Sequence, residues 1–169
     1  DSWSVIRLDD GDRVVGAVEL STGDEELVFV TADAQLLRFA ASSVRPQGRP
    51  AGGMAGIRLG DGQRVVFFGA VDRERESVVV TAAGTSGALP GTSSATVKVT
   101  PFKSYPAKGR ATGGVRAHRF LKGETDVVVA WVGPRPVGAT GTGEPVELPA
   151  ADPRRDGSGF AVMLGPTVV

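Results

Sequence analysis

The sequence of 169 residues contains no cysteine, one histidine and one tyrosine. The lack of cysteine excludes disulfides and thiolate metal sites, and it favours an intracellular location. No apolar run approaches the roughly 18 residues that a membrane span needs. Residues 1–8 have neither the basic start nor the apolar run of a signal peptide. We therefore expect a globular protein, because the 41% of hydrophobic residues suffice for a core.

The sequence also lacks any stretch that combines helical periodicity with good helix formers. Its 24 glycines and 11 prolines separate short segments rich in valine. Such segments, bounded by polar turns, are typical of β-strands. The sequence therefore predicts an all-β fold. The segments predicted as strands are residues 13–20, 27–31, 35–39, 57–59, 64–70, 78–81, 95–99, 126–132, 145–148 and 160–164.

A basic pattern rich in glycine occurs twice in the sequence. Residues 43–59, here named the first basic stretch, contain G-R-P-A-G-G-M-A-G-I-R-L. Residues 101–120, the second basic stretch, end in G-R-A-T-G-G-V-R-A-H-R-F and align with the first without a gap. Residues 27–33 likewise parallel residues 77–83. This internal repetition decides the architecture before any single motif does.

A repeat of roughly 50 to 60 residues is typical of propellers and related arrays of four-stranded blades. We divide a single domain of residues 1–169 into repeats 9–59, 60–121 and 122–169. Residues 149–159 are predicted to be a degenerate copy of the pattern, the third basic stretch. Because I-R-L at 6–8 matches I-R-L at 57–59, we expect the chain to be a piece of a longer protein.

The net charge of zero hides a strong asymmetry along the chain. Residues 1–42 hold nine acidic residues against three arginines, whereas residues 96–122 hold seven basic residues and no acidic one. Positive charge is thus concentrated in the repeated stretches. A concentrated basic patch, more than the overall charge, indicates a polyanion binder.

The motif G-R-x-x-G-G-V-R-x-x-R-F, with its V-R-P-x-G-R copy upstream, resembles the C-terminal domain of the A subunit of bacterial type II DNA topoisomerases. This family comprises DNA gyrase and topoisomerase IV, and the resemblance covers residues 6–120. It implies a β-pinwheel, a propeller-like array of four-stranded blades that exchange a strand with their neighbours. The family usually has five or six blades, whereas about three repeats occur here. The chain resembles topoisomerase IV more closely, because the gyrase heptapeptide Q-[RK]-R-G-G-[RK]-G is absent.

The resemblance implies a non-catalytic domain that binds and bends DNA on its perimeter and so positions the transported segment. The implied partners are double-stranded DNA, the rest of the A subunit and the ATPase B subunit. The implied location is the bacterial cytoplasm, and no membrane partner is expected. No cofactor, catalytic residue or metal site is expected in the domain. ATP and magnesium would serve the whole enzyme.

Lysine and arginine side chains bind phosphates, and nearby glycines let the backbone approach the duplex. The alternative for Arg49 and Arg110, which occupy equivalent positions, is a structural hydrogen bond to a strand-end carbonyl. The paired glycines at 52–53 and 113–114 are predicted to serve turns with positive φ. The candidate DNA-binding residues are Arg45, Arg49, Arg58, Lys103, Lys108, Arg110, Arg116 and Arg119.

Four further features are assigned to structure. His118 takes the place of Ile57 in the alignment and is predicted to be a packed or surface residue. Tyr105 is predicted to pack, or to contact phosphate through its hydroxyl. D-D-G-D at 9–12 lacks the further ligands of a calcium loop and is predicted to be a turn. G-A-T-G-T-G at 138–143 neither opens a helix nor precedes G-K-[ST], so it is no nucleotide loop.

Two rival functions remain open. A propeller that binds an acidic protein partner through the same basic surface is the main alternative. An enzyme in its own right is disfavoured. The sequence has a lone histidine, no cysteine and no catalytic constellation of paired carboxylates, and so offers little catalytic chemistry.

Overall fold

The computed structural model describes residues 5–48, 51–86, 95–140, 142–162 and 166–168. Within these ranges the chain forms eleven strands in three antiparallel sheets, together with two short 3-10 helices. The predicted all-β class is therefore confirmed. None of the described helices is long and apolar enough to cross a membrane.

The first four-stranded sheet, blade 1, has the strand order β3-β1-β2-β6. Strands β1 (Glu26–Thr31) and β2 (Gln35–Ala40) form a hairpin, and β2 runs into the 3-10 helix η1 (Ala41–Ser43). The two outer strands, β3 (Val65–Val71) and β6 (Val115–Arg116), come from later parts of the chain. Blade 1 is thus completed by the residues that follow it, as the exchange of strands in a pinwheel requires.

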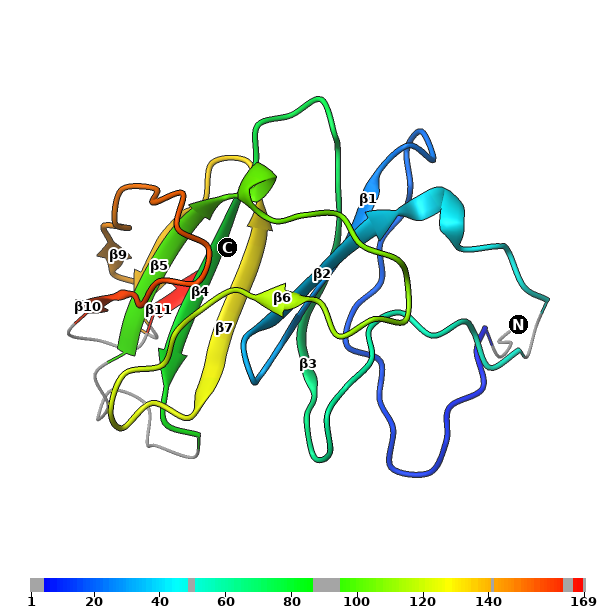
Figure 1. Ribbon diagram of the computed structural model, residues 1–169, viewed down its shortest axis with the longest axis horizontal. Coiled ribbons are helices and arrows are strands. Elements are labelled where there is room, and N and C mark those ends of the chain that lie inside the picture. The colour runs from blue at the N-terminus through cyan, green and yellow to red at the C-terminus, as the bar shows by residue number, and fades with distance from the viewer. Residues whose placement is uncertain (1–4, 49–50, 87–94, 141, 163–165, 169) are drawn as a thin grey trace.

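The second sheet, blade 2, repeats this arrangement with the order β10-β5-β4-β7. Its hairpin consists of β4 (Val78–Gly84) and β5 (Ala95–Pro101), and β5 runs into η2 (Phe102–Ser104). The outer strands β7 (Asp126–Gly133) and β10 (Phe160–Val162) again come from later in the chain. Figure 1 shows the two blades as neighbouring sheets, with β6 crossing in front between them.

A smaller third sheet lies beside blade 2 at the opposite end from blade 1 (Figure 1). Its strands are β8 (Gly138–Thr140), β9 (Pro145–Val146) and β11 (Pro166–Val168), in the order β11-β8-β9. Two strands of this sheet, β8 and β11, were not predicted from sequence, and neither was β6 of blade 1.

The outer strands β6 and β10 hold the same register in their blades. Val115 of β6 pairs with Leu36, and Phe160 of β10 pairs with Val97. The third basic stretch therefore leads into β10 as the second leads into β6. Its assignment as a further copy of the pattern agrees with this register.

The alignment of the two hairpins from sequence was wrong by two residues. It paired Leu27 with Ser77. In the structure the amide of Ala41 donates to the carbonyl of Glu25, and the amide of Phe102 donates to that of Ser77, both at 2.9 Å, so Glu25 is the counterpart of Ser77. Side chains alternate with a period of two along a strand, so a shift of two residues keeps every side chain on its own face. The hydrophobic pattern alone cannot detect such a shift.

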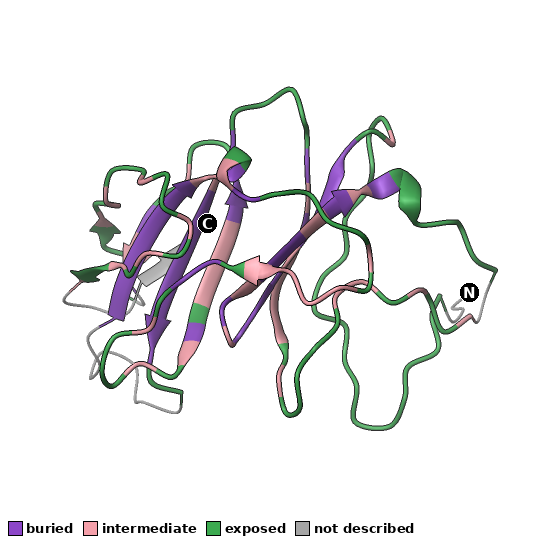
Figure 2. Ribbon diagram, viewed as in Figure 1, coloured by how far each residue is buried: buried purple, intermediate pink, exposed green. Residues whose placement is uncertain are grey.

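Residues 13–20, predicted as a strand, are irregular and exposed (Figure 2). Val14, for example, keeps 62% of its surface exposed. The corresponding segment of the next repeat becomes β3 because it pairs with β1 of the preceding repeat, in blade 1. The described part of the chain offers residues 13–20 no such hairpin, and an unpaired strand is not stable. Residues 57–59 are likewise not a strand.

The largest apolar cluster joins the two blades. It contains Val28 and Leu36 of blade 1, Val79 and Val127 of blade 2, and Tyr105 from the second basic stretch. Tyr105 is only 1% exposed, and burial raises its pKa to about 12. The predicted packing role of Tyr105 is confirmed. Its hydroxyl is too deeply buried to contact a phosphate at the protein surface.

Candidate nucleic-acid interface

The first and second basic stretches lie side by side, joined by hydrogen bonds. The amide of Arg58 donates to the carbonyl of Thr112 at 3.0 Å. Nη1 of Arg110 donates to the carbonyl of Ala55 at 2.6 Å. Glycines and prolines prevent helix formation here, so the loops satisfy their backbone groups by bonding to each other.

The second and third basic stretches are joined in the same way. The amide of Arg119 donates to the carbonyl of Gly157 at 3.0 Å, which repeats the bond of Arg58 one blade along. The amide of Gly159 donates to Nε2 of His118 at 3.2 Å. All three stretches therefore run next to one another across one face of the molecule.

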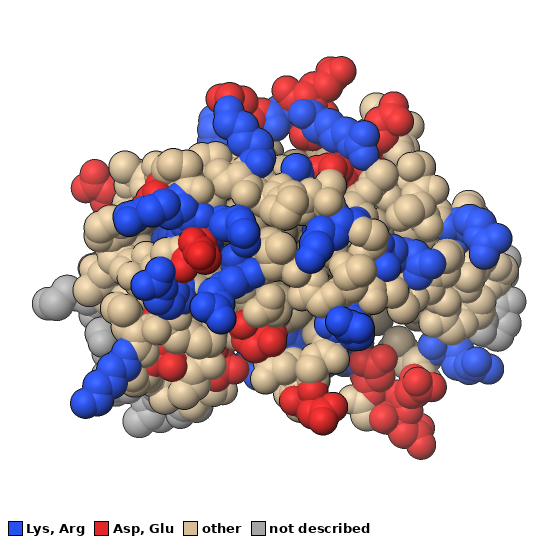
Figure 3. Space-filling model, viewed as in Figure 1, with Lys and Arg blue, Asp and Glu red and all other residues tan. Residues whose placement is uncertain are grey.

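Figure 3 shows this face of the molecule, with its lysine and arginine side chains in blue. Lysine and arginine side chains form a band across its middle, and acidic side chains gather above and below. The basic stretches run under this band in the matching view of Figure 1. Acidic side chains enter the band on its left, where the third basic stretch runs.

Four of the candidate residues are exposed and have no ion pair or side-chain hydrogen bond to any residue that the structure describes. Such side chains can turn to phosphates without breaking a bond in the protein. Lys122 shares this state but was not selected, although it belongs to the same acid-free run. The four candidates are Arg45, Arg58, Arg116 and Arg119.

Arg110 makes a structural hydrogen bond to a carbonyl, the alternative that its alignment with Arg49 suggested. It is half-buried, and its bond to Ala55 holds the two stretches together. Arg49 itself lies outside the described residues.

The two candidate lysines are exposed but make contacts. Nζ of Lys108 lies 3.2 Å from the carbonyl of Gly114, within its own stretch. Nζ of Lys103 lies 3.5 Å from the carboxylate of Glu76, an exposed ion pair. Of the two, Lys108 is the stronger candidate for a phosphate contact, because no carboxylate pairs with it in the described structure.

Lys98, counted in sequence with the basic run, is buried at 2% exposure. Its Nζ donates to the carbonyls of Ala117, at 2.7 Å, and Arg155. Burial is the main cause that lowers its pKa to about 8, against the opposing effect of Asp152 and Asp156. Lys98 thus ties the second and third basic stretches to β5 and is not available to DNA.

His118 is a buried structural residue, as one of its two predicted roles required. Its exposure is 1%, and its Nδ1 lies 2.9 Å from the hydroxyl of Thr81. Because Nε2 accepts from the amide of Gly159, we assign the ring proton to Nδ1. Burial is the main cause that lowers the pKa of His118 to about 4. Its counterpart Ile57 packs in an apolar cluster of blade 1 instead.

Only the second glycine of each pair has positive φ. Gly53 has φ of 78° and Gly114 has φ of 74°, whereas Gly52 and Gly113 do not. A Cβ on Gly114 would lie 2.7 Å from the carbonyl carbon of Leu36, where the loop enters β6 against β2. The prediction of positive φ was therefore right for Gly53 and Gly114 and wrong for the glycine before each.

D-D-G-D at 9–12 forms the turn predicted for it. The amide of Asp12 donates to the carbonyl of Asp9 at 3.1 Å, which closes a turn with Gly11 at φ of 81°. The start of G-A-T-G-T-G is strand β8. Across the residues described, no three histidine, aspartate or glutamate side chains cluster as metal ligands would.

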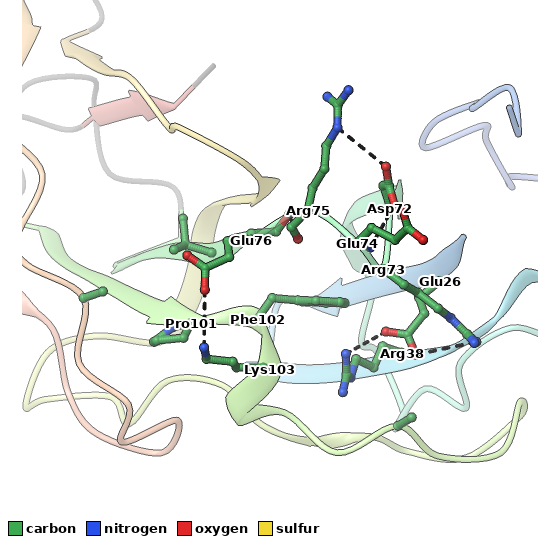
Figure 4. A pocket seen from close by; sticks show the side chains of 14 residues that line it. Glu26, Arg38, Asp72, Arg73, Glu74, Arg75, Glu76, Pro101, Phe102 and Lys103 are labelled. Carbon is green, nitrogen blue, oxygen red and sulfur yellow. Dashed lines mark hydrogen bonds and ion pairs between the residues drawn. The ribbon is translucent and has the colours of Figure 1, made fainter. Parts of the chain in front are cut away.

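A hollow of about 860 Å³ lies between the blades, near η2 and the loop from β3 to β4 (Figure 4). Its cations are paired, for example Arg38 with Glu26 at 2.6 Å and Arg75 with Asp72 at 3.5 Å. Arg38 also lies over the ring of Phe102, 4.6 Å from its centre. Cations held in this way leave little charge for a polyanion, so the band in Figure 3 is the better surface.

Comparison with known proteins agrees with this architecture. The C-terminal domain of DNA topoisomerase IV superposes with a TM-score of 0.75 at 24% identity, over 97% of this chain and 52% of that one. The gyrase A C-terminal domain superposes with a TM-score of 0.50 at 18% identity, over 70% of this chain and 36% of that one. These likenesses show the fold.

The relatives by sequence are A subunits of DNA gyrase. The protein of Escherichia coli K12 is 36% identical over 110 residues, covering 65% of this chain and 11% of that protein. The protein of Staphylococcus epidermidis ATCC 12228 is 32% identical over 123 residues, covering 73% and 13%. The chain thus spans little more than a tenth of the length of these relatives.

The profile of the family described as DNA gyrase C-terminal domain, beta-propeller, matches residues 4–21, 25–72 and 91–130. The matched residues include the hairpin of blade 1, strand β5 of blade 2 and the first two basic stretches. The chain therefore belongs to the family of DNA gyrase C-terminal β-propeller domains.

Proposed function

We propose that this chain is a non-catalytic domain that binds and bends double-stranded DNA. The observation that carries the proposal is the alignment of the basic stretches on one face, with Arg45, Arg58, Arg116 and Arg119 exposed and unpaired among the described residues. Duplex DNA is a rod of phosphates, and each cation that neutralises a phosphate releases a counterion. A continuous band of cations gives such a rod a path to follow.

The contacts are with the backbone of the duplex and do not depend on base sequence. Arginines on irregular loops next to glycines suit phosphate oxygens, whereas base readout usually places a helix or ribbon in the major groove. Binding should therefore be indifferent to sequence and should weaken steeply as salt rises.

In the whole protein the domain would belong to the A subunit of an ATP-dependent type II topoisomerase in the bacterial cytoplasm. It would hold the transported DNA segment while the ATPase B subunit, together with the rest of the A subunit, carries out the reaction. ATP and magnesium would serve those other parts. The absence of the gyrase heptapeptide favours a topoisomerase IV type of protein.

The test is the double variant Lys108→Glu and Arg116→Glu, measured by filter binding to duplex DNA. We expect at least a tenfold loss of affinity and an unchanged circular dichroism spectrum. The matched control is Arg73→Glu with Arg75→Glu, which changes the net charge equally at the hollow between the blades. Equal losses in both variants would contradict a defined DNA surface. A wild-type domain that ignores DNA would favour the protein-interaction module instead.

A further inference from the structure

The third basic stretch has the backbone arrangement of the second but not its charge. The amide of Lys108 donates to the carbonyl of Arg38 on β2 at 3.0 Å. One blade along, the amide of Asp152 donates to the carbonyl of Val99 on β5 at 2.9 Å. Arg38 and Val99 are each the third residue from the end of their strand. Asp152 therefore occupies the place of Lys108, with the opposite charge.

Asp152 also holds the nearest cation of its stretch. The guanidinium of Arg154 donates to Oδ2 of Asp152 from Nη2 at 2.8 Å and from Nε at 3.0 Å. The side-chain hydrogen bond from Arg154 is the main cause that lowers the pKa of Asp152. A guanidinium that donates through two nitrogens to one carboxylate is held in one direction, and the carboxylate offsets its charge.

The rest of the stretch offers no surplus of positive charge. Two arginines and two aspartates between residues 149 and 159 give a formal charge of zero. Arg155 is half-buried, and its carbonyl is fastened by Lys98. Figure 3 shows the result as acidic side chains within the left part of the band.

We propose that the phosphate-binding surface ends between the second and third basic stretches, and that Asp152 is the residue that ends it. The carboxylate of Asp152 lies on the DNA path at the position that Lys108 occupies one blade earlier. Asp152 also holds the guanidinium of Arg154 away from the phosphates. The duplex leaves the domain at this point. This inference rests on the proposed function and adds where the DNA path stops.

The test is Asp152→Asn, because asparagine can still accept the bond that the Arg154 amide gives to Oδ1 at 2.9 Å. We expect hydroxyl-radical protection of a long duplex to extend beyond the wild-type footprint. The slope of log affinity against log salt should become steeper by about 1, which corresponds to one more neutralised phosphate. The matched control is Asp72→Asn, since Asp72 also accepts a backbone amide and pairs with an arginine, Arg75, but lies at the hollow between the blades.

A second arm uses Arg154→Ala, which should leave DNA affinity within about twofold of wild type, whereas Arg116→Ala should lower it several-fold. A large loss with Arg154→Ala would overturn the inference. So would an Asp152→Asn footprint and salt slope equal to those of wild type and Asp72→Asn. Failure of the wild-type domain to protect any DNA would instead overturn the proposed function itself, and the inference with it.

Discussion

Nδ1 of His118 lies 2.9 Å from the hydroxyl of Thr81, inside the face of blade 2 that packs against the second basic stretch. The corresponding face of blade 1 is apolar: Ile57 of the first basic stretch packs there against a cluster that includes Leu37. The two blades share one architecture, but the equivalent contact between blade and basic stretch is polar in blade 2 and apolar in blade 1. The packing of blade 2 against the second basic stretch contains a titratable side chain, His118, so its stability should depend on pH.

Acid should destabilise the domain through His118. Its pKa is about 4 when folded against 6.5 when exposed, so the unfolded chain binds the proton first as pH falls below 6.5. The stability contributed by neutral His118 is present above pH 6.5 and is lost progressively down to pH 4. We expect a loss of about 2 kcal/mol between pH 7 and pH 5, measured by urea unfolding.

The control for this pH dependence is His118→Gln, which keeps a polar side chain but does not titrate. It should be less stable than wild type at pH 7 and should change less between pH 7 and pH 5. An equal fall in both proteins would assign the acid sensitivity to carboxylates elsewhere.

Gly114→Ala should destabilise the fold far more than Gly113→Ala. At Gly114 a Cβ combines positive φ with a collision against the backbone of Leu36, whereas at Gly113 the nearest atoms lie 4.0 Å away. We expect a difference of at least about 2 kcal/mol in the free energy of unfolding. Thermal melting of the two variants checks this, and equal melting temperatures would contradict it.

Arg110 and Arg45 should separate stability from binding. Arg110→Ala removes the bond to the carbonyl of Ala55 and should cost about 1 to 2 kcal/mol of stability. Arg45 is exposed and unpaired among the described residues, so Arg45→Ala should leave stability within about 0.5 kcal/mol and weaken DNA binding. A reversed pattern in urea unfolding and filter binding would exchange the two roles.

The domain should bend DNA without imposing a strong chiral wrap. The second basic stretch has an excess of positive charge, whereas the third has a formal charge of zero. The two stretches should therefore bind a duplex with different strength. Bending a site of 20–30 base pairs costs about a few kcal/mol, which a neutral stretch does not offset. Ligase closure of nicked circles with added domain should give little change in linking number. A large shift of one sign that grows with protein would show wrapping.

Much of the fold was accessible from sequence because its determinants are local. Valine-rich segments predicted the hairpin strands β1, β4 and β5, and the alternation in L-L-R-F predicted β2. The repeated Gly-Arg pattern predicted the array. The acid-free run from 96 to 122 indicated the basic face. The Gly-Gly pairs marked the turns, although only the loop's contact with β2 shows why Gly114 is the constrained member.

The folded arrangement decided which strands share a blade and which cations face solvent. Residues 13–20 and β3 have similar sequences, but among the described residues only β3 has a hairpin to pair with. Lys98 and Lys108 are the same residue type in one basic run, yet Lys98 points into the joint between stretches and Lys108 points out. Hydrogen-bond partners and burial depend on segments distant in the chain, which composition and spacing do not encode. The repeating β architecture and the places where cations are concentrated are thus properties of the sequence, whereas folding decides which of those cations remain available for DNA.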